Sequence, residues 1–216
     1  MKLKEFDFWA FKLELEESRQ FSLFCRSVCA HFERHFQPIE TENIYRIIIK
    51  ISESEERNST TEESSSVLKY YKSFNFDKFS KMKEISKKEF LLDFLFESLL
   101  ELCKKFKWST ESFLNAYNLV KREKFVNTYV HKRKNSRNRK LIAELECHHE
   151  SAKFDCYLKV YDRSGNEVLN KLLFTEDPDE FLFNGLLGDI KWLDNQTLML
   201  LRRDRSEVER FKLNST

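Results

Sequence analysis

The sequence predicts an α+β fold, in which N-terminal strands with about three helices are followed by a mainly antiparallel β part. Up to about residue 122, segments with apolar residues at helical spacing lie between strand-like segments. After residue 123 the apolar period changes to two, and turn residues separate short β-rich segments. We therefore expect an α+β part at 1–122 and a mainly antiparallel β part at 123–216, either as separate domains or as one continuous domain.

The chain is expected to open with a strand, a helix and a second strand. Residues 3–16 alternate between apolar and polar, and the apolar side changes near Trp9, which predicts a long, bulged strand. Ser18 can cap the next helix, whose apolar residues recur at helical spacing until Pro38 ends it. The β-branched segment 43–51 predicts the second strand.

The next segment, 52–66, contains no apolar residue and is acidic, which predicts a mobile, solvated loop. A further strand is expected at 67–76. Residues 86–89, Ser-Lys-Lys-Glu, have the spacing of a capping box, and the apolar run 90–106 predicts a helix buried on two sides. Ser109 can cap another helix, and the short connection between the two favours a helix pair.

The C-terminal part is expected to consist of hairpins. Apolar residues alternate along several short segments, and turn residues such as Gly165 and Asn166 stand between them. The predicted strands cover residues 125–131, 141–147, 154–161, 167–174, 190–193, 197–201 and 208–213. Pro178 suits the first position of a short helix, because the N–H that proline lacks would have no helical partner there.

Glycine is too scarce for the common nucleotide-binding loops. The chain has three glycines, Gly165, Gly185 and Gly188, all late in the sequence. Phosphate-binding loops need glycines between a strand and a helix, because their backbone must approach the phosphates closely. The segment from Gly185 to Gly188 has neither the spacing nor the flanking elements of such a loop. We therefore expect no cofactor.

Charge and cysteine usage predict a cytoplasmic protein that does not bind membranes. The chain has 38 Lys and Arg against 36 Asp and Glu, which leaves a formal charge of +2 and no bulk attraction to nucleic acid or lipid. No apolar run approaches the roughly 20 residues that span a bilayer, and the first residues lack the apolar core of a secretory signal. Five cysteines, an odd number, favour free thiols in a reducing compartment.

One group of residues with the ligand types of a zinc site falls within the first predicted helix. It consists of Cys25, Cys29, His31 and His35. Cys29 and His31 point about 200° apart on a helix, so one helix cannot turn all four side chains toward one ion. We therefore interpret the group as two core thiols and two surface or boundary histidines.

A weaker candidate metal site lies in the β part. Cys147 and His149 share a face of a predicted strand, and a turn centred on residues 151 and 152 would place Cys147 opposite Cys156. A fourth ligand is missing, and Ser-Ala is not a favoured two-residue turn. We therefore expect ordinary strand thiols and no bound metal.

The most polarised segment of the chain is 131–140. Its basic residues, which are candidate partner-binding residues, are Lys132, Arg133, Lys134, Arg137, Arg139 and Lys140. A solvated hairpin loop has the same composition and is the alternative interpretation. Phosphate-binding surfaces usually combine a wide basic face with aromatic side chains, and this run contains none. An acidic protein surface is therefore favoured slightly over nucleic acid as the partner.

No catalytic motif is recognisable, since neither Gly-x-Ser-x-Gly nor His-Glu-x-x-His occurs and nothing singles out a pair of carboxylates. This, with an aromatic content of 14%, favours a non-enzymatic protein-binding module. In size, charge balance and lack of motifs the chain is similar to bacterial immunity proteins, which implies a cytoplasmic inhibitor that neutralises a partner protein. The alternatives are a nucleic-acid-associated protein that uses 131–140 and an enzyme without a compact motif.

Overall fold

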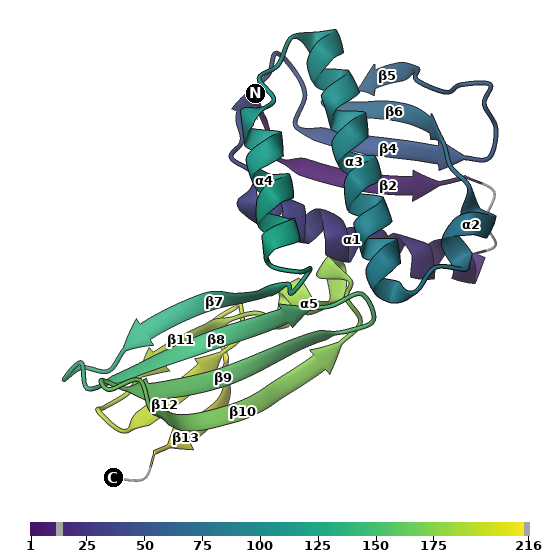
Figure 1. Cartoon of the computed structure of the whole chain (residues 1–216). Coiled ribbons are helices and arrows are strands. Elements are labelled where there is room, and N and C mark those ends of the chain that lie inside the picture. The colour runs from purple at the N-terminus through teal and green to yellow at the C-terminus, as the bar shows by residue number, and fades with distance from the viewer. Residues whose placement is uncertain (12–14, 214–216) are drawn as a thin grey trace. The chain divides into compact units, whose positions relative to one another are not determined.

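The computed structural model describes residues 1–11 and 15–213 (Figure 1). The chain divides into two compact units, Met1–Val126 and Asn127–Thr216. The first unit combines strands and helices, and the second consists mainly of antiparallel strands. The predicted α+β fold class is thereby confirmed. In the described part of the chain, no helix is long and apolar enough to cross a membrane.

The first unit is built on a four-stranded sheet. Its strands lie in the order β2 (Glu5–Ala10), β4 (Arg46–Ser52), β6 (Val67–Ser73) and β5 (Thr61–Ser64). The first three strands are parallel and β5 is antiparallel to β6. Parallel neighbours need a crossover connection, which α1 (Leu15–His35) supplies between β2 and β4. Two short strands, β1 (Lys2–Leu3) and β3 (Ile39–Glu40), form a separate pair.

Three long helices pack on one face of this sheet (Figure 1). They are α1, α3 (Glu84–Phe106) and α4 (Glu111–Arg122), while α2 (Phe76–Ser80) is a short helix after β6. The buried ring of Phe6 in β2 lies 5.3 Å from that of Phe32 in α1 and 6.2 Å from that of Phe113 in α4. Trp9, which points to the opposite face of β2, is 53% exposed. One face of the sheet therefore carries the core, and the other is open.

The strand predicted at 3–16 is too long, because β2 ends at Ala10, Phe11 lies in a bend and Leu15 already belongs to a helix. Residues 12–14 lie outside the described residues, and α1 begins at Leu15, so Ser18 lies inside the helix and does not cap it. The last residue of β2, Ala10, pairs with Ile51, and Phe11 N still donates a hydrogen bond of 3.0 Å to Ile51 O, although the chain bends at Phe11.

The acidic segment 52–66 is not a loop throughout, because four of its residues form the edge strand β5. Glu62 accepts hydrogen bonds from Lys69 Nζ at 2.6 Å and from Tyr71 Oη at 2.8 Å on the neighbouring strand β6. Cross-strand polar pairs of this kind hold a strand that contributes nothing to the core, so apolar alternation does not reveal it.

The predicted capping box at Ser86 is also wrong, since α3 begins two residues earlier at Glu84. Its N-cap is Lys83, which makes no side-chain cap hydrogen bond. An ion pair of 3.2 Å between Lys88 Nζ and Glu84 Oε1, one turn apart, stabilises the additional residues. At α4 the N-cap is Thr110, although Ser109 Oγ accepts a hydrogen bond from Glu111 N at 3.3 Å.

The second unit contains two antiparallel sheets. One consists of β7 (Thr128–Asn135), β8 (Leu141–His149), β9 (Phe154–Asp162) and β10 (Glu167–Glu176), in the order β10-β9-β8-β7. The other has the order β11 (Asp189–Trp192), β12 (Thr197–Leu201) and β13 (Glu207–Lys212). Buried apolar residues from both sheets belong to one core.

All seven strands predicted after residue 123 are present among the described residues, although the first begins at Thr128 and not at 125, and two further details differ from the sequence prediction. The short helix α5 (Glu180–Leu186) has Asp179 as its N-cap, so Pro178 precedes the cap and does not occupy the first helical position. Strand β7 continues to Asn135, so the first half of the basic segment 131–140 is strand and only its second half is turn.

Candidate functional site

The structure divides the predicted basic segment into parts with different surroundings. Lys132, Arg133 and Lys134 lie in β7, whereas the other three residues belong to the turn before β8 or lie next to it. Arg133 Nε forms an ion pair of 2.5 Å with Glu144 Oε1 across the strands, so its charge is balanced. Lys132 and Lys134 line a hollow in the surface of the second unit.

A β-bulge sets the direction of these two lysines. Val130 pairs with Glu146, and Lys132 pairs with Leu145, the adjacent residue of β8. His131 is therefore an extra residue in the ladder. In a regular strand Tyr129 would share its face with residues 131 and 133. Because the bulge shifts the alternation by one residue, Lys132 and Lys134 instead share the face of Tyr129, which packs on the core.

The hollow has a volume of about 820 Å³ and is called the basic concavity below. Its walls come from β7, from the start of β11 and from the end of β12 with the turn that follows. The basic side chains in its lining are His131, Lys132, Lys134, Lys191, Arg202, Arg203 and Arg205. The lining contains one carboxylate, that of Asp189. Within the described residues, six permanently charged cations therefore face one anion.

Two local features hold the walls together. Trp192 Nε1 donates a hydrogen bond of 3.0 Å to Lys134 O, which ties β11 to β7. In the turn after β12, Arg202 N donates to Ser206 O at 2.9 Å, and the carboxylate of Asp204 accepts from both N and Oγ of Ser206. Arg205 adopts a left-handed φ of 68° in this turn. The turn therefore presents its arginines from a hydrogen-bonded frame.

Most cations of the basic concavity form no ion pair within the described residues, although hydrogen bonds from Ser206 and, further, the charge of Arg202 lower the pKa of the Asp204 carboxyl in the adjoining turn. Lys134 Nζ lies 3.8 Å from Asp189 Oδ2, and no other lysine or arginine of the lining forms an ion pair within the described part of the chain. Burial, together with the neighbouring charge of Lys132, lowers the pKa of His131 from its ordinary value, so this imidazole is neutral at neutral pH. Mutual repulsion among the remaining cations favours an anionic partner.

The other predicted basic residues lie outside the basic concavity. Lys140 lines a different hollow, together with the carboxylates of Asp162 and Asp194. Arg137 and Arg139 line none of the hollows described for this unit, and the backbone carbonyl of Arg139 accepts a hydrogen bond from Arg163 Nε at 2.9 Å. Only two of the six predicted residues therefore contribute to the main basic surface.

The weak candidate metal site in the β part is not assembled. Cys147 does lie opposite Cys156 across β8 and β9, as the sequence predicts. His149 Nε2, however, lies 3.3 Å from Pro178 O, and its ring packs against Phe183. The hydrogen bond with Cys147 and burial both raise the pKa of Cys156, so its thiol stays protonated. These three residues are not among the groups whose ligand atoms gather closely in the described chain.

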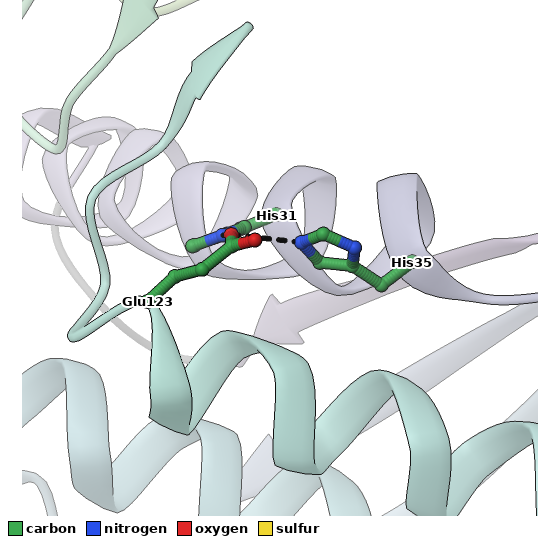
Figure 2. Close-up of side chains that lie close together, drawn as sticks. All are labelled: His31, His35 and Glu123. Carbon is green, nitrogen blue, oxygen red and sulfur yellow. Dashed lines mark hydrogen bonds and ion pairs between the residues drawn. The ribbon is translucent and has the colours of Figure 1, made fainter.

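The cysteine and histidine residues of α1 separate into two groups. Cys25 and Cys29 are fully buried in the core, as predicted. His35 is partly exposed, but His31 is only 2% exposed, so its predicted boundary position is wrong. Both imidazoles point toward the carboxylate of Glu123, which directly follows α4 (Figure 2). His31 Nε2 lies 2.7 Å and His35 Nε2 lies 2.8 Å from the same oxygen, Glu123 Oε2.

The sequence alone did not identify the arginines that complete the basic concavity or the carboxylate that completes the cluster of His31 and His35. Arg202, Arg203 and Arg205 form a short basic run between two predicted strands, and this charge run is a signal that could have identified them. Glu123 lies 92 residues from His31, and no local pattern connects the two. Comparison of the chain with protein-family models, with curated proteins and with solved structures finds no match.

Proposed function

We propose that the chain is a non-enzymatic protein-binding module, which captures an acidic surface of a partner protein in the basic concavity. The observation that carries the proposal is the gathering of six permanent cations around one hollow with a single carboxylate. Like charges held together oppose folding unless a partner offsets their repulsion. Carboxylates of a bound protein would do so and would also steer its approach.

The lining of the basic concavity suits a protein segment that carries both apolar and acidic side chains. Leu187, Met199 and Leu201 supply apolar surface between the cations. Interfaces usually bury an apolar centre and surround it with a polar rim, and their strongest contacts are side chains inserted into pockets. A volume of about 820 Å³ is large enough for a few side chains of an inserted loop.

Nucleic acid fits this surface less well. Single strands are held by a basic groove together with aromatic rings on which the bases stack. No Phe, Tyr or Trp belongs to the lining of the basic concavity, which residues 131–205 of the described chain supply. The cations also surround a hollow, whereas a phosphate backbone needs an extended path.

We place this interaction in the cytoplasm. All five cysteines of the chain lie in its described part and carry free, buried thiols, which suits a reducing compartment. A cytoplasmic inhibitor of the immunity-protein type, which neutralises its partner by occupying a site on it, is the specific form of this proposal. Its binding surface would need charge and shape but no reacting group.

The proposal is tested by affinity capture from the native host with purified full-length protein, with and without nuclease, followed by mass spectrometry. We expect one stoichiometric protein that remains after nuclease treatment and that carries an acidic surface. The double variant Arg202→Gln/Arg203→Gln should bind this protein roughly 2- to 30-fold more weakly, because two exposed ion pairs contribute about 0.4–2 kcal/mol together.

The matched control is Arg137→Gln/Arg139→Gln, which removes two arginines that lie outside the basic concavity. Its affinity should equal that of the wild-type protein. If the control loses binding and the Arg202/Arg203 variant retains it, the turn before β8 and not the basic concavity is the binding surface. Capture that disappears with nuclease would replace the acidic protein by nucleic acid.

A further inference from the structure

The cluster of His31, His35 and Glu123 has no role in the proposed protein-binding function and lies in the other unit of the chain. We infer that these three side chains bind a divalent transition-metal ion and that Zn²⁺ is the ion that suits them best.

Helix geometry places the two imidazoles side by side. His31 and His35 are four residues apart on α1, so they lie on one face of the helix, one turn from each other. Their ring centroids are 5.5 Å apart. Glu123 closes the group from the end of α4, and the three ligand atoms all lie within 4.8 Å of one another. Segments far apart in the sequence thus place three donors around one point (Figure 2).

The donor set is the one that zinc uses where three protein side chains hold it. Two imidazole nitrogens and one carboxylate oxygen leave a fourth tetrahedral position for water. At zinc–ligand distances of about 2.0–2.1 Å, tetrahedral donors are about 3.4 Å apart. The observed distances of 2.7 and 2.8 Å from the imidazoles to Glu123 Oε2 are shorter. The carboxylate must therefore withdraw by about 0.6 Å to admit the ion.

Exposure of the three side chains allows both that movement and entry of the ion. The His31 side chain is 3% exposed, that of His35 is 19% exposed and that of Glu123 is 38% exposed. The buried imidazole is held by the core, while the carboxylate on the solvent side has room to move. A metal site needs such an entry path in addition to its ligands.

The backbone conformation after Glu123 is a separate observation. It indicates that the surrounding structure holds Glu123 in its position. Lys124 and Phe125 follow it with left-handed φ angles of 52° and 62°. Two consecutive non-glycine residues in this region cost stability, and Phe125 is a bulky residue for which the conformation is rare. The reversal buries Phe125 in the core and leaves Glu123 facing the histidines. Strain of this kind is concentrated at functional sites.

The protonation states in the cluster suit metal binding. Burial lowers the pKa of His31 from its ordinary value and outweighs the opposing effect of the hydrogen bond that His31 donates to Glu123, so the imidazole is neutral at neutral pH. Burial alone would raise the pKa of Glu123, but the hydrogen bonds from His31 and His35 together hold it below its usual value. A neutral imidazole and an ionised carboxylate are the forms that coordinate metal.

The competing explanation is a purely structural one, in which Glu123 Oε2 accepts two imidazole N–H bonds and fastens the end of α4 to α1. The variant Glu123→Gln separates the two explanations. An amide oxygen still accepts both hydrogen bonds and keeps the shape, but it carries no charge and is a poor zinc ligand. A structural role therefore predicts little change in this variant, and a metal site predicts loss of the ion.

The experiment uses full-length protein without a histidine tag, freed of metal by chelation and titrated with Zn²⁺ against a chromophoric chelator. Native mass spectrometry gives the stoichiometry. We expect one Zn²⁺ per chain with a Kd at or below about 1 μM. Glu123→Gln and His35→Gln should each weaken binding by about 100-fold or more, because even partners of metal ligands contribute 10- to 100-fold. Co²⁺ in place of Zn²⁺ should give the visible spectrum of a four-coordinate ion.

The matched control is His148→Gln in the second unit. His148 Nε2 lies 2.7 Å from Glu146 Oε1, a comparable pair that is not part of a three-ligand group. Zinc affinity should be unchanged in this variant. Circular dichroism of each variant confirms that it is folded. The inference would be overturned if Glu123→Gln bound zinc as tightly as the wild-type protein, or if the wild-type protein bound no stoichiometric zinc. The cluster would then serve only to join α4 to α1 by hydrogen bonds.

Discussion

Gly188 is the position where one added methyl group should do the most damage to the basic concavity. A Cβ atom there would lie 1.7 Å from Leu201 O, 2.7 Å from Leu201 C and 2.8 Å from Arg202 C. All three are backbone atoms, so no side-chain rotation can relieve the contact. Gly188→Ala must therefore push the start of β11 away from the end of β12, where Asp189 pairs with Leu201.

The expected loss of stability follows from that separation. An ordinary contact begins at 3.4 Å, so the two strands must part by more than 1 Å at this point. Overpacking of this kind costs about 1–3 kcal/mol, and a lost ladder hydrogen bond adds about 1 kcal/mol. We expect the free energy of unfolding of the second unit to fall by about 2–4 kcal/mol. Arg202 lies at the same point, so partner binding should weaken as well.

The assay is urea unfolding followed by the fluorescence of Trp192, the tryptophan of the second unit, with Trp9 and Trp108 replaced by Phe. The matched control is Gly185→Ala in α5, where an added Cβ meets nothing within 4 Å. Alanine there should stabilise the unit by up to about 1 kcal/mol, because glycine is the poorer helix former. The reasoning would be refuted if the two substitutions changed the free energy of unfolding equally, or if Gly188→Ala left it unchanged.

Two further predictions concern ionisable groups. Burial and, second, the hydrogen bond to the Glu101 carboxylate raise the pKa of Tyr70 from 10 to about 12. The phenol is therefore protonated in the folded chain but not in the unfolded chain between pH 10 and 12, and stability should fall across this window. The ultraviolet titration of Tyr70→Phe should lack this late tyrosinate, and curves that superimpose would contradict the assignment. Burial also raises the pKa of Cys25 and that of Cys103, the latter to about 11, and all five thiols are buried. A disulfide reagent at pH 8 should therefore react with the five thiols only after denaturation, and one fast stoichiometric thiol in the native protein would contradict this.

Helices and strands with a periodic apolar pattern in the sequence were predicted well. The helix 90–106 and the hairpin that places Cys147 opposite Cys156 are present as expected, because burial of one face leaves a repeat in the local sequence. The errors fall where another interaction sets the boundary. The strand expected at 3–16 ends at Ala10, before the bend at Phe11, and α3 starts before Ser86 because an ion pair supports two more residues.

Polar segments gave the weakest predictions. The edge strand β5 lies within the acidic segment 52–66 because Glu62 bonds to Lys69 and Tyr71, and none of these bonds leaves an apolar pattern. In the basic segment 131–140, composition identified the positive charge but not the face of the sheet toward which each side chain points. One extra residue in β7 turns Lys132 and Lys134 toward the basic concavity, while Arg133 pairs with Glu144.

The sequence by itself determined the α+β class, the positions of most helices and hairpins and the presence of a strongly basic segment, since periodicity and composition are local properties. Only the tertiary structure decided which distant residues meet. It brought Arg202 and its neighbours to Lys132 and Lys134, and it placed Glu123 between His31 and His35. The physical reason is that both groups are assembled by core packing and strand register, which depend on contacts between segments far apart in the chain.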